Sequence, residues 1–211
     1  MARPNIFTLL HERVMKDQTL SEQEKNARLW FRHYQRAIDK FAFPPHLSYD
    51  TIRQQMPDKQ VVPGNAAQRG RLYFFRYQAQ QLRPGDYYDA LPFVLVTDTS
   101  SVGFSGLNFH YLPYRTRAIF MDAMVRAQTV DYGDTLKTKI DISVDELKKQ
   151  DKYKAYRGCY RSYRTSALRS PLLQVGETQW ATALFLPVEL FRGASTSTVW
   201  NAAQRRIVRE D

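Results

Sequence analysis

The chain has 211 residues, a formal net charge of +10, a single cysteine and an apolar share of 43%, which fits one domain with a sizeable buried core and argues against wholesale disorder. The single cysteine excludes an internal disulfide, no apolar run approaches the length of a membrane span, and the first residues lack a signal-peptide pattern. We therefore expect a protein that is made in the cytoplasm and has no membrane among its partners.

The first part of the chain predicts two helices. Apolar residues share one face over residues 5–16, and a capping box at Ser21 and Glu24 begins a second helix that should end at about Lys40, before two prolines. The other face of this second helix carries Lys25, Arg28, Arg32, Arg36 and Lys40. This face is either a phosphate-binding surface or a solvated helix surface.

Residues 42–69 are rich in proline and show no regular periodicity. A helical turn is expected after Ser48, and residues 56–69 are expected to form a linker. We therefore divide the chain into a helical N-terminal arm with its linker, residues 1–69, and an α+β core domain, residues 70–211.

The densest apolar and aromatic material follows this linker and predicts the core. Residues 71–78 predict a strand that is covered on both faces, because both sets of alternating positions are largely apolar. One set is Tyr73, Phe75 and Tyr77, and the other is Leu72, Phe74 and Arg76. Residues 92–97 predict its antiparallel hairpin partner. Residues 98–103 predict a loop, and residues 104–111 an irregular strand in which glycine allows a bulge.

The second half predicts helices that alternate with short strands. A helix is expected over residues 114–126, and a capping box at Ser143 and Glu146 begins another that should end near Lys152. The remaining expected elements are a loop or strand over 129–133, strands over 138–142 and 172–175, an element of undecided type over 180–186, a short helix over 188–192, and a basic C-terminal helix capped by residues 195–197 that ends near Val208.

Residues 153–169 combine five Lys and Arg side chains with four tyrosines and no acid. Such a composition suits a surface that follows a nucleic-acid backbone and stacks its bases. Arginine and tyrosine also carry binding energy in protein interfaces, and a partly buried element with exposed arginines has the same composition. All three interpretations stay open. The candidate residues for binding a protein or nucleic-acid partner are Lys154, Arg157, Tyr160, Arg161, Tyr163, Arg164 and Arg169.

No pattern for catalysis is present in the sequence. The four histidines are scattered outside any metal-ligand spacing, and no phosphate-binding loop, dinucleotide fingerprint or nucleophile elbow occurs. Asp86, Asp89 and His110 are the candidates for a nuclease-like site. We interpret the two aspartates as turn residues and the histidine as a packed structural residue. We therefore expect no enzyme, catalytic residue, metal, cofactor or small-molecule substrate.

The cysteine also has two interpretations. Cys159 lies near Arg157 and Arg161 in the sequence, and these charges would lower the pKa of its thiol. No histidine and asparagine pattern accompanies it, so we interpret it as an incidental cysteine.

Two parts of the chain resemble small virion proteins of contractile-tailed bacteriophages. The first runs from Pro-Gly-Asp-Tyr-Tyr-Asp-Ala-Leu-Pro at 84–92 to the Gly-Phe-Ser-Gly-Leu-Asn-Phe-His-Tyr segment at 103–111 and the helix after it, and the second lies at 180–200. The resemblance covers about residues 71–206. It implies a virion or baseplate component, and some such proteins resemble the DNA-end-protector type of head-completion protein. It implies no catalytic residues.

From these observations we expect an α+β fold, with a small, mostly antiparallel sheet or partly open barrel and flanking N- and C-terminal helices. The leading hypothesis is a non-enzymatic structural protein of a tailed-phage virion, assembled in the host cytoplasm. It would bind other subunits in the tail or baseplate, in several copies arranged as a ring. The alternative is a DNA-binding end-protector or head-completion protein at the head–tail connector.

Overall fold

The structure is a computed structural model that describes residues 47–56, 60–130, 139–140, 142–176 and 179–208. The two predicted N-terminal helices lie outside the described residues. The helices are α3 (Tyr49–Gln55), α4 (Tyr114–Gln128), α5 (Val144–Lys149), α6 (Tyr156–Cys159), α7 (Trp180–Phe185) and α8 (Thr196–Val208). Short 3-10 turns are η2 (Gly64–Ala66), η3 (Phe109–Tyr111), η4 (Asp151–Tyr153) and η5 (Thr165–Ala167). No described helix is both long enough and apolar enough to cross a membrane.

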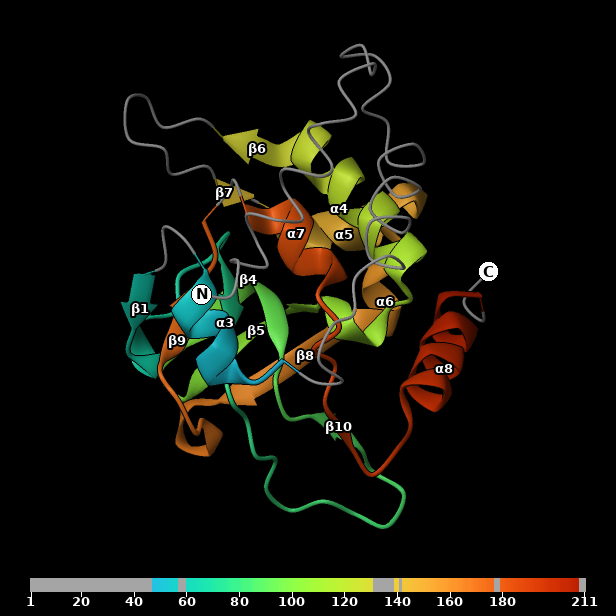
Figure 1. The fold of residues 1–211 in the computed structure, drawn as a ribbon. Coiled ribbons are helices and arrows are strands. Elements are labelled where there is room, and N and C mark those ends of the chain that lie inside the picture. The colour runs from blue at the N-terminus through green and yellow to red at the C-terminus, as the bar shows by residue number, and fades with distance from the viewer. Residues whose placement is uncertain (1–46, 57–59, 131–138, 141, 177–178, 209–211) are drawn as a thin grey trace, which may run out of the picture.

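A six-stranded antiparallel sheet forms the centre of the molecule (Figure 1), with the order β1-β9-β2-β4-β5-β8. The strands are β1 (Gln60–Val62), β2 (Leu72–Phe74), β3 (Tyr88–Asp89), β4 (Phe93–Ser100), β5 (Gly103–Asn108), β6 (Thr129–Val130), β7 (Lys139–Ile140), β8 (Tyr160–Arg164), β9 (Leu172–Gln174) and β10 (Phe191–Arg192). Two further pairs, β3 with β10 and β6 with β7, lie outside this sheet. The sheet is open, since β1 and β8 are its two edges. The predicted α+β class is therefore confirmed, in its open-sheet form.

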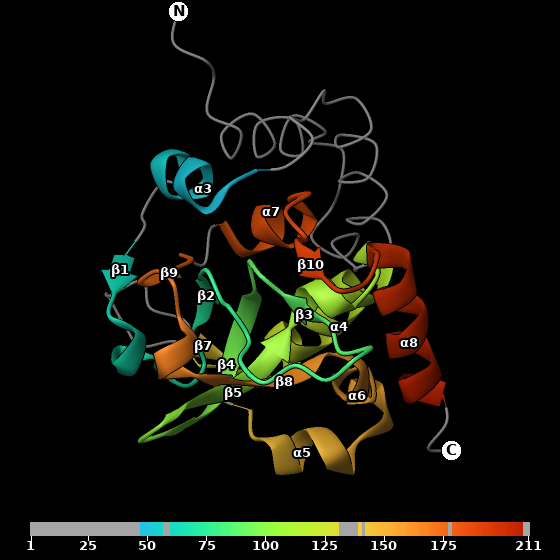
Figure 2. The same ribbon diagram turned by 90° about the horizontal axis from the view of Figure 1, so that it is seen from below.

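Each face of the sheet has its own apolar cluster. On one face, Leu72, Phe74 and Leu95 belong to a large core that also contains side chains of α4, α7 and α8. On the other face, Tyr73 and Phe75 belong to a smaller cluster with Phe104 and Tyr163. The alternation predicted for residues 71–78 is thus confirmed, although β2 itself covers three of those residues. Figure 2 shows α8 at the edge of the molecule, beside α6.

The hairpin β4–β5 differs from its prediction in length. The segment expected as a loop over residues 98–103 continues β4 to Ser100 and turns back through Ser101 and Val102 into β5. The register shifts between Val96 and Asp98, which marks a bulge in β4. Beyond this bulge, β4 continues to pair with β5, so residues 98–100 form the end of an extended hairpin and not the predicted polar loop.

Two other predictions are wrong because the segments pair with strands that are distant in the sequence. Residues 188–192 do not form a helix, because Phe191 and Arg192 pair with Asp89 and Tyr88 as β10 and β3. Residues 60–62, placed in the predicted linker, pair with β9 as an edge strand of the sheet. Backbone groups in both segments find distant strand partners that no local pattern reveals. The division of the chain at residue 70 stays a prediction.

The helix predictions agree more closely with the structure. Helix α4 begins at Tyr114 as expected, and the undecided segment after residue 180 is the helix α7. The capping box of α5 is present, with the Ser143 hydroxyl accepting from the Glu146 N–H at 3.2 Å. Helix α5 ends at Lys149, earlier than expected, and η4 follows it.

A buried arginine joins the elements on the helical side of the sheet. Arg117, in α4, is fully buried and donates hydrogen bonds of 2.9 Å to the carbonyl oxygens of both Leu112 and Leu184. It also pairs with the Glu189 carboxylate. Its guanidinium carbon lies 4.4 Å from the centre of the Tyr114 ring. These contacts connect α4 to the end of α7 and to the segment before β10.

Candidate functional site

The structure separates the predicted partner-binding residues of 153–169 instead of gathering them on one surface. The segment passes through η4, α6, the edge strand β8 and η5 in succession. Lys154, Arg157 and Tyr160 are half-buried, and the Tyr160 hydroxyl donates to the Asp98 carboxylate at 3.3 Å. These three side chains are therefore partly covered by the fold, and the binding of a partner by this segment stays a prediction.

Arg161 and Tyr163 support the fold. The Arg161 guanidinium lies 3.8 Å from the centre of the Tyr111 ring and donates to the carbonyl oxygens of Tyr160 and Gly158. Tyr163 is buried, and its hydroxyl accepts a 3.0 Å hydrogen bond from the Asn108 amide. Burial raises the pKa of Tyr163 well above its ordinary value, so this hydroxyl stays neutral.

Arg164 and Arg169 are the exposed cations of the segment. Arg169 donates to the side-chain oxygen of Gln78 at 2.9 Å and to two nearby carbonyl oxygens, so it braces the turn around η5. Arg164 is the last residue of β8 and pairs with Gly103 at the start of β5. A Cβ atom on Gly103 would overlap the Tyr163 carbonyl oxygen, so glycine permits this close approach.

Cys159 has the opposite environment from the one that neighbouring arginines suggested. The thiol is fully buried and lies 3.5 Å from the Ala155 carbonyl oxygen. Burial raises its pKa to about 12, and this effect outweighs the lowering by Arg161. The burial and the raised pKa agree with the interpretation of Cys159 as an incidental cysteine, and the thiol is an inert part of the core.

Of the nuclease-like candidates, Asp86 lies apart, whereas Asp89 and His110 form a buried pair. Asp86 is exposed and its carboxylate accepts from the Arg83 backbone N–H at 2.8 Å, as expected for a turn residue. Asp89 is buried and accepts from the His110 ring nitrogen Nδ1 at 2.8 Å and from the Asn108 amide at 3.0 Å. The packed histidine is confirmed, and Asp89 also accepts from the Leu91 backbone N–H at 3.0 Å, the contact by which an aspartate forms a turn.

Among the described residues, no group of three or more His, Cys, Asp or Glu side chains lies close enough together to hold a metal ion.

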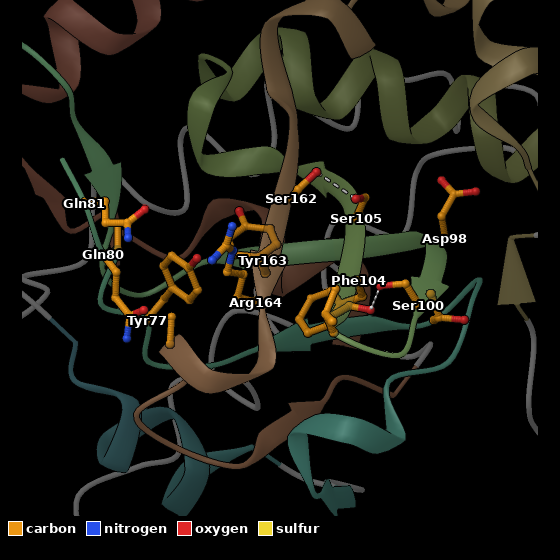
Figure 3. A pocket seen from close by; sticks show the side chains of 15 residues that line it. Tyr77, Gln80, Gln81, Asp98, Ser100, Phe104, Ser105, Ser162, Tyr163 and Arg164 are labelled. Atoms are coloured by element: carbon orange, nitrogen blue, oxygen red, sulfur yellow. Dashed lines mark hydrogen bonds between the residues drawn. The ribbon is translucent and has the colours of Figure 1, made fainter. Parts of the chain in front are cut away.

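A groove of about 490 Å³ lies beside the edge strand β8, on the face of the smaller apolar cluster. It is built from three separate segments of chain, around residues 77–81, 98–105 and 162–167. Figure 3 shows Tyr77, Gln80 and Gln81 at one end, Asp98 and Ser100 at the other, and Phe104, Tyr163 and Arg164 between them. The groove therefore combines an aromatic floor with amides, hydroxyls and an arginine.

Specific contacts shape the walls of this groove. The Ser105 and Ser162 hydroxyls share a 2.8 Å hydrogen bond across β5 and β8, and the Ser100 hydroxyl donates to the Gly103 carbonyl oxygen at 3.1 Å. Gln81 has a φ of 58°, a left-handed conformation that is uncommon for residues other than glycine. This backbone conformation turns the chain sharply at the rim.

A second hollow of about 500 Å³ adjoins the turn between β4 and β5. Its lining is Ser101, Val102, Arg164, Thr165 and Ser166. Val102 and Arg164 line both hollows. Val102 is 71% exposed, a high value for an apolar side chain at the tip of a hairpin.

The comparisons with known proteins identify the family. A family model described as the phage T4 terminal DNA protecting protein matches residues 44–205. The chain belongs to this family. The match extends from before α3 into α8, and it includes every residue that lines the groove. No match was found among curated proteins or among solved structures.

Membership in the terminal DNA protecting family confirms the resemblance to phage proteins of the DNA-end-protector type. Sequence reasoning singled out Tyr163 and Arg164 but missed the other segments of the groove. The one signal in the sequence that could have indicated the groove was the hydroxyl-rich run from Thr97 to Ser101, which is followed by the isolated Val102. Most of that run was interpreted as a loop, so its place in the same groove as residues 77–81 was not foreseen.

Proposed function

We propose that this protein binds the ends of packaged phage DNA and protects them as a non-enzymatic component of the virion. The observation that carries the proposal is the family match over residues 44–205, since the family is described as a terminal DNA protecting protein. This function was the alternative in the sequence-based interpretation. The tail or baseplate subunit that led that interpretation, and its ring of copies, stay predictions.

The charge of the chain supports binding to DNA. The described residues include 20 Lys and Arg but nine Asp and Glu, so the basic excess is present within the residues that the structure describes. Phosphate contacts dominate the affinity of proteins for DNA and make it fall steeply with salt. We therefore expect a salt-dependent attraction to duplex DNA that is independent of sequence.

The groove supports recognition of an end. Arg164 supplies a cation at a strand edge, and the nearby hydroxyls and amides are groups that donate hydrogen bonds to phosphate oxygens. A groove of about 490 Å³ has the volume of a small-ligand site, so it suits a terminal nucleotide and not an intact duplex. We therefore place end recognition at the groove and general phosphate attraction on the surrounding surface.

Binding to ends is tested with two duplexes of equal length and sequence. One has free ends, and the other is closed at both ends by hairpin loops. We expect tighter binding to the open duplex and slower digestion of that duplex by an exonuclease when the protein is present. Equal affinity for the two duplexes, together with unchanged digestion, would refute the proposal.

The position of the site is tested by Arg164→Ala, with Arg115→Ala as the matched control. Arg115 is also exposed but belongs to α4 and does not line the groove. Loss of a phosphate contact at Arg164 should weaken binding to open ends and reduce the slope of log affinity against log salt by about one. An equal effect of both substitutions would place the phosphate contacts outside the groove.

The location in the particle is tested by quantitative mass spectrometry of purified heads and purified tails. A protein at DNA ends should be recovered with heads, in very few copies. Recovery with tails, at a multiple of three or six copies, would instead support the baseplate prediction.

A further inference from the structure

The groove has the composition of a nucleotide site more than that of a track for the DNA backbone. Of the described side chains that line it, two are charged, Arg164 and Asp98. The rest are aromatic, small, amide or hydroxyl groups. Its volume of about 490 Å³ lies in the range of about 300–1,000 Å³ that is typical of small-ligand sites. One nucleotide is therefore the natural size of occupant.

We propose that the groove receives one unpaired nucleotide at the DNA end, an inference that rests on the proposed function. Its base lies against the aromatic side of the groove at Tyr77, and its phosphate lies beside Arg164. Gln80 and Gln81 lie at the same end of the groove as Tyr77 (Figure 3), so their amides would contact the edge of the base. Amide groups donate and accept hydrogen bonds, so they suit more than one base.

Tyr77 is the ring best placed to contact a base. Phe104 and Tyr163 are 4% and 6% exposed, so they form the floor, whereas Tyr77 is half-buried. Edge-to-face contacts fix the Tyr77 ring, at 5.0 Å and 88° to Tyr163 and at 6.4 Å and 84° to Phe75. A ring held in this way stacks on a base with little loss of side-chain entropy.

The charges set the direction in which the nucleotide lies. Asp98 is exposed at the opposite end of the groove from Tyr77 and receives hydrogen bonds from the hydroxyls of Thr97 and Tyr160. Its carboxylate repels phosphate, whereas Arg164 attracts it. The phosphate is therefore placed toward Arg164 and away from Asp98.

Val102 is positioned to contact the last base pair of a duplex whose unpaired nucleotide lies in the groove. Its side chain is 71% exposed at the β4–β5 turn and borders both hollows. Exposed apolar side chains at comparable positions pack against base pairs and separate stacked bases in DNA-bending proteins. Val102 is thus placed to cover the last base pair while the unpaired nucleotide enters the groove.

The test uses DNA hairpins with one free end, each labelled for anisotropy at the loop. The free end is blunt, carries one unpaired nucleotide on the 5′ or 3′ strand, or carries the same overhang without its base. We expect the overhang of one polarity to bind about tenfold more tightly with its base than without it, the effect expected of one base–aromatic stack. Equal affinities with and without the base, in both polarities, would overturn the inference.

Two variants of Tyr77 assign the effect to the groove. Tyr77→Leu keeps an apolar side chain but removes the ring, so it should abolish the advantage of the base. Tyr77→Phe keeps the ring and should retain it. A base advantage that survives Tyr77→Leu in a folded variant would place the nucleotide elsewhere.

A measurement on the unaltered protein supports the variants. A 2-aminopurine placed as the unpaired nucleotide should lose fluorescence on binding, because stacking on an aromatic ring quenches it. Unchanged fluorescence at saturation would contradict the stack.

Comparison of the hairpins with one free end against a duplex closed at both ends separates the inference from the proposed function. Preference for a free end over a closed hairpin, without any effect of the base, would refute the nucleotide site but leave end binding intact. Absence of any preference for free ends would refute both.

Discussion

Replacing Arg117 with methionine should destabilise the fold strongly. Methionine has a similar length and no charge, so the substitution removes the hydrogen bonds and the ion pair with little change in volume. The carbonyl oxygens of Leu112 and Leu184 and the carboxylate of Glu189 would each lose a donor. The carboxylate is the costly one, because its side chain is 7% exposed and would remain buried with a net charge.

The magnitude follows from that burial. Removing one partner of a buried ion pair costs about 3–5 kcal/mol. For a chain of this size, about 1 kcal/mol of lost stability lowers the Tm by about 2–4 °C. We therefore expect Arg117→Met to lower the Tm by about 6–20 °C. The double substitution Arg117→Met with Glu189→Leu should recover part of this loss, because no unpaired charge remains in the core.

The assay is thermal and urea unfolding followed by circular dichroism, with Arg115→Met as the control. Arg115 lies in the same helix and is exposed, so its substitution should change the free energy of unfolding by less than about 0.5 kcal/mol. A loss below about 1 kcal/mol for Arg117→Met, or a double substitution no more stable than the single one, would refute the reasoning.

Three further outcomes are expected. Gly106→Ala should lower the free energy of unfolding by about 1–3 kcal/mol in urea titrations, because a Cβ atom there would overlap the Leu95 carbonyl oxygen. Wild-type stability of this variant would show that β4 and β5 can move apart to accommodate a Cβ atom without cost. Cys159 should react with a thiol reagent at pH 8 only after unfolding, since burial raises its pKa to about 12, and rapid labelling of the native protein would contradict its burial. Ser143→Ala should cost about 0.5–2 kcal/mol through loss of the α5 cap. Hydrogen bonds from the Ser143 backbone and hydroxyl lower the pKa of Glu146. The part of the cap that the Glu146 carboxylate makes is therefore present above the unfolded glutamate pKa of about 4.3 and is lost as the pH falls through the lower pKa of the folded state, whereas the hydrogen bond from the Glu146 N–H is kept. The difference between wild type and Ser143→Ala should therefore shrink in acid, and a constant difference from pH 7 to pH 3 would contradict this linkage.

Local signals were sufficient for several elements. The capping box at Ser143, the entry of α4 after Pro113 and the basic helix α8 each depend on hydrogen bonds and side-chain spacing within a few residues. The two-faced apolar pattern of residues 71–78 predicted that the sheet would be covered on both sides, and the two clusters confirm it. A strand buried on both faces carries that fact in its own composition.

The candidate site shows where local signals end. Arg161 and Arg164 look alike in the sequence. In the structure, the Arg161 guanidinium lies against the Tyr111 ring, whereas Arg164 lies exposed at the groove. Three residues apart on β8, the two arginines point to opposite faces of the sheet, and the pairing of β8 with β5 decides what each of them contacts. The sequence contained the groove's residues but gave no sign of their proximity.

Sequence patterns were sufficient to predict the α+β class, the helices with local caps and the resemblance to phage proteins of the DNA-end-protector type. The exposure of particular arginines, the pairing of β1 and β10, and the groove formed by residues 77–81, 98–105 and 162–167 became visible in the tertiary structure alone. The physical reason is the range of the interactions. Caps and periodicity are satisfied within one or two turns of chain, whereas strand pairing and burial depend on partners that are tens of residues away.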